Sequence, residues 1–219
     1  MKKVGLLVGI LCLVCVVIQA QVKNYALNQF SFEDTSGHKY SLEQLKGKVV
    51  FVDCWFPACP PCRAEMPYSA LLQQRLYAMK MDSNIVFVTI SFKQTTADWK
   101  LALQQLPMPQ AIHLYSPAST YEIALAGGNY PTYRIFNAAG ILDIENTSYP
   151  SELGKIDFIL FAATQNIDVT EAKRIFEEQG EKLLSGKIQK SKYGLLNIFF
   201  ERFKPHQTDF KKALQQLQH

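Results

Sequence analysis

The sequence predicts an α/β fold with a central mixed sheet, followed by a C-terminal extension that contains only helices. Short β-branched and aromatic runs alternate with helical patterns from residue 48 to residue 126, as in a largely parallel sheet covered by helices. A hairpin pattern follows at 132–145 and adds antiparallel strands. Beyond residue 165, apolar residues recur only at helical spacing. We therefore divide the chain into a leader at 1–20, an α/β body at 21–164 and a helical extension at 165–219.

The first twenty residues have the pattern of a secretory signal peptide. Lys2 and Lys3 precede an apolar run from Val4 to Ile18, and Ala20 offers a small residue at a cleavage site. The run is shorter than the roughly 20 apolar residues of a membrane-spanning helix. We predict cleavage after Ala20 and a periplasmic or otherwise extracytoplasmic location, with an uncleaved membrane anchor as the alternative.

The body begins with a hairpin and a short helix. Turn-forming residues within 25–46 separate short apolar stretches and predict these two elements, the helix ending near Lys46. Lys48–Asp53 is apolar on both faces, as a buried parallel strand requires. Residues 61–80 follow as a helix, because Pro61 is tolerated in a first turn whose N–H groups are unpaired. The later elements are strands at Asn84–Ser91, Ala111–Tyr115, Thr132–Phe136 and Ile141–Glu145, and helices at Ala97–Gln105, Ser119–Ala126 and Ser151–Ala163.

The extension differs from the body in both structure and charge. We predict helices at 168–184, 191–203 and 207–218, whose apolar stripes favour packing on the body or on one another over contact with a membrane or a partner protein. The formal net charge of the chain is +4. The body carries 11 Lys and Arg against 12 Asp and Glu, and the extension carries 10 against 7. A near-neutral body gives no indication of nucleic-acid binding.

The cysteines point to redox chemistry. Cys12 and Cys15 lie in the leader that we expect to be removed, which leaves Cys54, Cys59 and Cys62, an odd number for an exported chain. The segment from Cys59 to Cys62, with two prolines between, follows a buried-type strand and opens a helix. A thiol at a helix N-terminus meets unpaired N–H groups and the positive end of the helix dipole, which stabilise its thiolate.

Cys59 is therefore the predicted nucleophile, and Cys62, one turn further along the same face, would resolve the mixed disulfide. The alternatives are a pair of inert buried thiols or half of a zinc site. A structural zinc site normally has four protein ligands, and no His lies nearby in the sequence. We expect no metal and no cofactor besides the cysteine pair. Cys54 fits a small buried apolar residue better than a redox group.

Two acids are placed to move the protons that accompany thiol–disulfide exchange. Asp53 ends the apolar strand and would lie beneath the cysteine pair, where burial raises its pKa toward neutrality. Glu65 follows Cys62 by three residues and falls on the adjacent helix face. Its alternative role is that of an exposed first-turn acid favoured by the helix dipole.

The stretch from Lys48 to Pro67 resembles the thioredoxin superfamily, and Cys-Pro-Pro-Cys-Arg-Ala-Glu-Met-Pro is similar to its exported TlpA/ResA-type thiol–disulfide oxidoreductases, which have a redoxin-type domain. The match runs from about Phe30 to Ala163 and includes Tyr130-Pro131 before a strand. It implies a three-layer fold, a redox-active disulfide between the two motif cysteines, and roles for both acids.

The resemblance also implies that Pro131 is cis and lies against the disulfide, while the backbone at Tyr130 binds an extended substrate. Pro60, between the cysteines, completes the expected substrate site. Two positions depart from the family pattern: Ala58 stands where Trp is usual, and Cys54 replaces an apolar core residue that is usually aromatic. The extension has no counterpart that we can name.

These features favour an exported thiol–disulfide oxidoreductase that reduces protein disulfides. No nucleotide-binding fingerprint is present, so we expect a membrane thiol reductant as electron donor. Pro60 lacks an N–H for the Cys59 sulfur, which favours a reductant over an oxidant. A thiol peroxidase of the peroxiredoxin type is an alternative, although those enzymes resemble Thr-x-x-Cys and Phe56 stands at that threonine position. Another is a binding or assembly module that acts through the helical extension.

Overall fold

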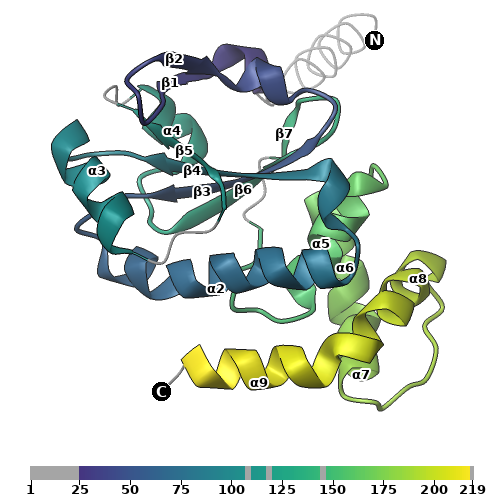
Figure 1. The fold of residues 1–219 in the computed structure, drawn as a ribbon. Coiled ribbons are helices and arrows are strands. Elements are labelled where there is room, and N and C mark those ends of the chain that lie inside the picture. Colours follow the sequence, from purple (N-terminus) through teal and green to yellow (C-terminus); the bar gives the residue numbers. More distant parts are fainter. Residues whose placement is uncertain (1–24, 107–109, 117–119, 144–146, 218–219) are drawn as a thin grey trace, which may run out of the picture.

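A mixed sheet with strand order β2-β1-β5-β4-β3-β6-β7 forms the centre of the protein (Figure 1). The structure is a computed structural model and describes residues 25–217 except 107–109, 117–119 and 144–146. The predicted signal peptide, with Cys12 and Cys15, therefore lies outside the described residues.

The strands are β1 (Ser31–Glu33), β2 (Lys39–Ser41), β3 (Val49–Trp55), β4 (Ile85–Ser91), β5 (Ile112–Tyr115), β6 (Thr132–Phe136) and β7 (Leu142–Asp143). The helices of the body are α2 (Pro60–Ala78), α3 (Thr96–Gln105), α4 (Thr120–Leu125) and α5 (Lys155–Thr164), with short 3₁₀ turns η1 (Leu27–Gln29), η2 (Leu42–Leu45) and η3 (Asp82–Asn84). The extension contains α6 (Val169–Ile175), the π-helical turn η4 (Phe176–Gly180), α7 (Glu181–Leu184), α8 (Gly194–Phe203), the 3₁₀ turn η5 (Lys204–His206) and α9 (Gln207–Leu217).

The body has three layers. Strands β3, β4 and β5 are parallel, and β6 pairs antiparallel with β3. Figure 1 shows α2 and α5 on one side of the sheet and α4 on the other. Separate clusters of buried apolar side chains fill the two sides. The α/β class, the mixed sheet and the thioredoxin-like layering predicted from the sequence are confirmed.

Two predicted helices differ in detail. The helix expected at Ser151–Ala163 begins only at Lys155. Gly154, the residue before it, has a φ of +83°, which is outside the helical range and prevents the helix from starting earlier. The helix expected at 168–184 contains the π-helical turn η4, in which Gly180 lies under the Phe176 ring; a Cβ at this glycine would come within 2.5 Å of the ring. The ends of two further predicted elements, at Ser119 and Glu145, fall outside the described residues.

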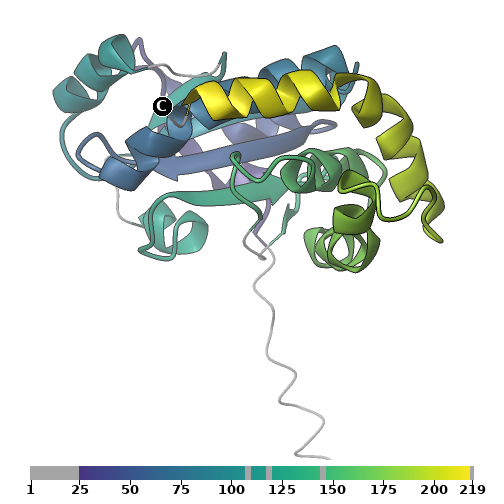
Figure 2. The same ribbon diagram turned by 90° about the horizontal axis from the view of Figure 1, so that it is seen from below.

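The extension packs on the body, as predicted. Its aromatic side chains Phe176 and Phe199 contact Phe158 of α5 at ring-centroid distances of 6.0 and 5.4 Å, within one cluster that also includes residues of α2 and β3. Helix α9 lies along α2 (Figure 2). No helix in the described part of the chain is both long enough and apolar enough to span a membrane.

A buried ion pair joins α2 to α5. The Arg75 guanidinium donates from Nε and Nη2 to the two carboxylate oxygens of Asp157, at 2.7 and 3.1 Å, and both side chains are fully buried. Nη2 also donates to the carbonyl of Pro150, and the Gly154 N–H donates to Asp157. The pair therefore fixes the last turns of α2, the start of α5 and the loop before it.

We predict that Asp157→Asn lowers the free energy of unfolding by about 3–5 kcal/mol, because it leaves the Arg75 charge buried without a counter-ion. Urea denaturation monitored by fluorescence measures this change. Glu171→Gln is the matched control, since Glu171 pairs with Arg174 in a similar geometry on the surface, and its effect should be much smaller. Equal effects of the two substitutions would contradict the prediction.

Candidate active site

The cysteine pair sits where β3 ends and α2 begins. Cys59 occupies the position before the first helical residue and forms a disulfide with Cys62, with 5.3 Å between the Cα atoms. The backbone N–H of Cys62 donates to the Cys59 sulfur at 3.2 Å. The sulfur of Cys59 therefore accepts a hydrogen bond from the helix N-terminus, the environment that stabilises a thiolate.

The two prolines limit this stabilisation. A side chain at this position can accept from the second or the third N–H of the helix. Pro61 holds the second position and Pro60 the first, so neither offers an N–H, and Cys62 supplies the donor. Pro60 and Pro61 are both exposed on the rim of the disulfide. From the sequence we expected Pro60 to be the residue whose missing N–H weakens the thiolate; the helix geometry shows that it is Pro61, at the second position.

The disulfide itself is covered. Cys59 and Cys62 are each 2% exposed, so exposure does not distinguish the nucleophile from its partner in this oxidised form. They pack with Trp55 of β3 and with Trp99 of α3. Trp99 was not predicted as a site residue, because the sequence shows it only as an apolar residue within a predicted helix.

Tyr130 packs against the cluster that contains the disulfide cysteines, and the peptide bond between Tyr130 and Pro131 is cis, as predicted. Pro131 is buried and Tyr130 is half-buried. The Tyr130 ring meets the Phe56 ring edge to face at 5.0 Å, and both rings pack against the cluster that contains the cysteines. The fold thus brings together the two segments that carry the expected substrate site.

Asp53 lies on β3 next to Tyr133 of β6, and it is 5% exposed. Burial and the negative charge of Glu65 raise the pKa of its carboxyl to about 7, and the Ser69 hydroxyl on α2 offsets part of this rise. Its Oδ1 atom has no hydrogen-bond partner among the described residues. A carboxyl that is half-protonated near neutral pH is able both to accept and to donate a proton.

Glu65 is half-buried on α2 and accepts a hydrogen bond from the Ser151 hydroxyl at 3.0 Å. Burial raises its pKa; the hydrogen bonds from Ser151 oppose this rise and the charge of Glu152 adds to it. The alternative of an ordinary exposed first-turn acid does not describe this side chain. The charge of Glu65 in turn contributes to the raised pKa of Asp53.

Cys54 is not part of this arrangement. Its side chain is fully buried in the apolar cluster on the opposite side of the sheet, where burial and the nearby Asp53 raise the pKa of its thiol. This placement fits the small buried apolar residue that the sequence favoured. No group of three or more His, Cys, Asp or Glu side chains within the described ranges is arranged to hold a metal ion.

The segment between β4 and α3 supplies two residues that the sequence did not single out. The Gln94 side-chain oxygen accepts a hydrogen bond from the Ala58 N–H at 3.0 Å, and the Lys93 ammonium lies over the Tyr130 ring. Both residues have positive φ, +57° at Lys93 and +60° at Gln94. A polar segment after a strand has no sequence signal that distinguishes it from an ordinary loop.

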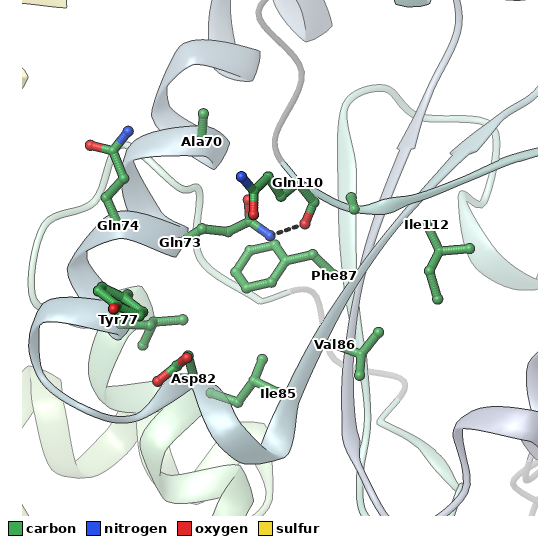
Figure 3. A pocket seen from close by; sticks show the side chains of 12 residues that line it. Ala70, Gln73, Gln74, Tyr77, Asp82, Ile85, Val86, Phe87, Gln110 and Ile112 are labelled. Carbon is green, nitrogen blue, oxygen red and sulfur yellow. Dashed lines mark hydrogen bonds between the residues drawn. The ribbon is translucent and has the colours of Figure 1, made fainter.

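A cavity of about 910 Å³ lies away from the disulfide (Figure 3). It is bounded by the C-terminal half of α2, with Gln73 and Tyr77, and by the first residues of β4 and β5, with Ile85 and Phe87. The Gln73 amide donates to the Gln110 carbonyl across it. Because the strands run toward the disulfide, this cavity is at the opposite end of the sheet and does not contribute to the redox site.

Comparison with known proteins identifies the family of the chain. A family model described as redoxin matches residues 21–139, more than half of the chain. The thiol-disulfide oxidoreductase ResA of Halalkalibacterium halodurans is 32% identical over 72 residues, which are 33% of this chain and 38% of that protein. The thioredoxin-like protein YneN of Bacillus subtilis is 32% identical over 114 residues, 52% of this chain and 64% of that protein.

Among solved structures, a Bacteroides vulgatus protein assigned as a thiol-disulfide oxidoreductase aligns with a TM-score of 0.54 and 22% identity, over 61% of this chain and 91% of that one. This similarity supports the fold. The chain spans less than two thirds of the length of the two curated relatives, 38% and 64%.

We predict that Asp53→Asn changes how stability depends on pH. The folded pKa of about 7 lies above the unfolded value of about 4, so the folded state binds the extra proton, and stability falls as pH rises between these values. The substitution should remove this loss, worth about 1.4 kcal/mol per unit of pKa shift, and should stabilise the protein at about pH 8. Urea denaturation of the oxidised protein at about pH 4 and about pH 8 measures the change. A variant profile parallel to that of the wild type would count against a raised Asp53 pKa.

Pro61→Ala should make the protein a stronger oxidant. The new N–H adds a second donor to the Cys59 sulfur, which lowers the pKa of that thiol and raises the reduction potential by roughly 30 mV per 1.4 kcal/mol of thiolate stabilisation. The pH dependence of alkylation and equilibration with glutathione measure the two quantities. Pro67→Ala, further along the same helix, should change neither. An unchanged thiol pKa in the Pro61 variant would refute the proposed role of this proline.

Proposed function

The chain belongs to the redoxin family, and from this membership we propose that it is an exported thiol–disulfide oxidoreductase that reduces disulfides in protein substrates. The observation that carries the proposal is the disulfide at the first turn of α2, in which the Cys62 N–H donates to the Cys59 sulfur. The cis Tyr130–Pro131 bond, with Tyr130 packed against the cluster that contains the cysteines, supports the use of an extended peptide as substrate.

The proposed reaction begins with both cysteines reduced. The Cys59 thiolate attacks one sulfur of the substrate disulfide, and the other substrate sulfur leaves as a thiolate. The Cys62 thiol then loses its proton and attacks the Cys59 sulfur, which forms the intramolecular disulfide and releases the second substrate thiolate. Two electrons and two protons pass from the protein to the substrate, and an external thiol reductant restores the dithiol.

The two acids are suited to the second step. Cys62 must lose a proton before it attacks, and the Asp53 carboxyl, with a pKa of about 7, is able to accept it at neutral pH. The charge of Glu65 contributes to the raised pKa of Asp53, and because its side chain is less buried it is the better placed of the two to exchange a proton with solvent. We assign Asp53 the proton transfer and Glu65 the role of raising its pKa and exchanging the proton.

Direction and location complete the proposal. A single backbone donor at the Cys59 sulfur favours a weakly stabilised thiolate and hence a reductant. We propose that the leader at 1–20 directs export, that a membrane thiol reductant supplies electrons, and that the substrates are proteins of the cell envelope. The apolar stripes of the extension are used in packing on the body, so we do not assign them a membrane or partner-binding role.

The decisive assay offers insulin and hydrogen peroxide separately to the reduced protein, with dithiothreitol as the regenerating thiol. We expect insulin reduction, and its loss by orders of magnitude in both Cys59→Ser and Cys62→Ser. When the reduced variants are freed of dithiothreitol before insulin is added, Cys62→Ser should accumulate a mixed disulfide with insulin through Cys59, because no resolving thiol is left, whereas Cys59→Ser should accumulate none. Mass spectrometry of the trapped species reads out the difference.

Peroxide consumption without insulin reduction would instead favour the thiol peroxidase. Cys54→Ala is the matched control, because this third thiol is buried on the other side of the sheet and should leave insulin reduction intact.

A further inference from the structure

We propose that Lys93 makes the redox site selective for disulfides whose cysteine is flanked by an acidic residue. The inference rests on the proposed reduction of protein disulfides and adds to it the charge of the preferred substrate. Three observations carry it: the Lys93 ammonium lies over two aromatic rings, both rings pack against the cluster that contains the disulfide, and the Lys93 side chain is exposed.

The segment that carries Lys93 is tied to the cysteine turn. The Gln94 side chain accepts from the N–H of Ala58, the residue before Cys59, and the Gln94 carbonyl accepts from the Tyr115 hydroxyl at 2.7 Å. Lys93 and Gln94 both adopt the left-handed conformation, which is unfavourable for residues with a Cβ and persists here because these bonds hold it. Lys93 therefore has a set position relative to Cys59.

Two aromatic rings hold the ammonium. Nζ lies 4.6 Å from the centre of the Tyr130 ring and 5.2 Å from that of Phe56. The faces of aromatic rings attract cations, so this geometry favours one position of an otherwise flexible side chain. Both rings pack against the cluster that contains the disulfide, which places the cation on its rim.

The cation faces outward and its counter-ion lies beneath. Nζ is 3.3 Å from the Glu122 carboxylate, but the Lys93 side chain is 44% exposed and that of Glu122 is 17% exposed. An ammonium has three donors, and those not directed to Glu122 are available to a second carboxylate. A substrate approaching the disulfide therefore meets the positive member of the pair first.

Tyr130 connects this cation to the substrate. In the proposed reaction the substrate strand lies along Tyr130 and Pro131. The residue next to the substrate's cysteine would then lie close to the Lys93 ammonium, which is positioned over the Tyr130 ring. An acidic side chain there is attracted and a basic one is repelled. Because Lys93 is exposed, the preference should amount to a few-fold in association rate and should weaken with salt.

Three synthetic peptide disulfides test this inference, identical except for Asp, Ser or Lys on either side of the cysteine. Stopped-flow measurement with the reduced wild type should give second-order rate constants about fivefold higher for the Asp than for the Lys peptide at low salt. The ratio should approach one in Lys93→Gln, persist in Lys93→Arg, and increase in Glu122→Gln. Lys100→Gln is the matched control, because Lys100 is an exposed lysine on α3, and it should retain the wild-type ratio.

The failures are distinguishable. A wild type that reduces none of the three peptides would overturn the proposed function and this inference with it. A wild type that reduces all three at equal rates would overturn the inference alone. An equal loss on all three peptides in Lys93→Gln would also overturn it, because the cation would then act on the Cys59 thiolate and not on the substrate.

Discussion

Arg75 and Asp157 form a fully buried, two-pronged ion pair between the last turns of α2 and the first turn of α5, and this pair limits where α2 can lie. Moving either helix would leave a charge buried without its partner, which is costly. Cys59 is at the other end of the same α-helix, so its position over the sheet depends on the pair. Helix α9 packs along α2 and adds a second support from the extension.

The end of β3 and the start of α2 combine opposite electrostatic effects. The N-terminus of α2 favours negative charge on the Cys59 sulfur, while burial and Glu65 disfavour it on the Asp53 carboxyl. The result is a sulfur suited to be ionised and an acid suited to hold a proton at the same pH. The prolines moderate the first effect, because the helix offers one N–H where another sequence would offer two.

Much of the fold was readable from local patterns. The strand before the cysteines, the helix after them and the final hairpin lie within a few residues of their predicted bounds, because β-branched runs, caps and glycine turns act locally. The resemblance carried by Cys-Pro-Pro-Cys and Tyr130-Pro131 was correct for family and fold. The helix expected at 168–184 was wrong at one turn, where the Phe176 ring occupies the space beside Gly180, four residues further on, and accompanies the π-helical turn.

The sequence by itself determined the cysteine pair that forms the disulfide and the helical nature of the extension, and it singled out the two acids to which we assign proton transfer, since each depends on residue type and short spacing. Only the tertiary structure decided that Trp99 packs with the disulfide and that Gln94 accepts a hydrogen bond from Ala58 in the cysteine turn. It also decided that the Lys93 ammonium lies over the Tyr130 ring. These contacts join residues more than thirty positions apart, and no local pattern encodes them. Alternate residues of a strand face opposite ways, but only the packing of α2 and α5 decided that the face of β3 that carries Cys54 is the one turned away from these helices.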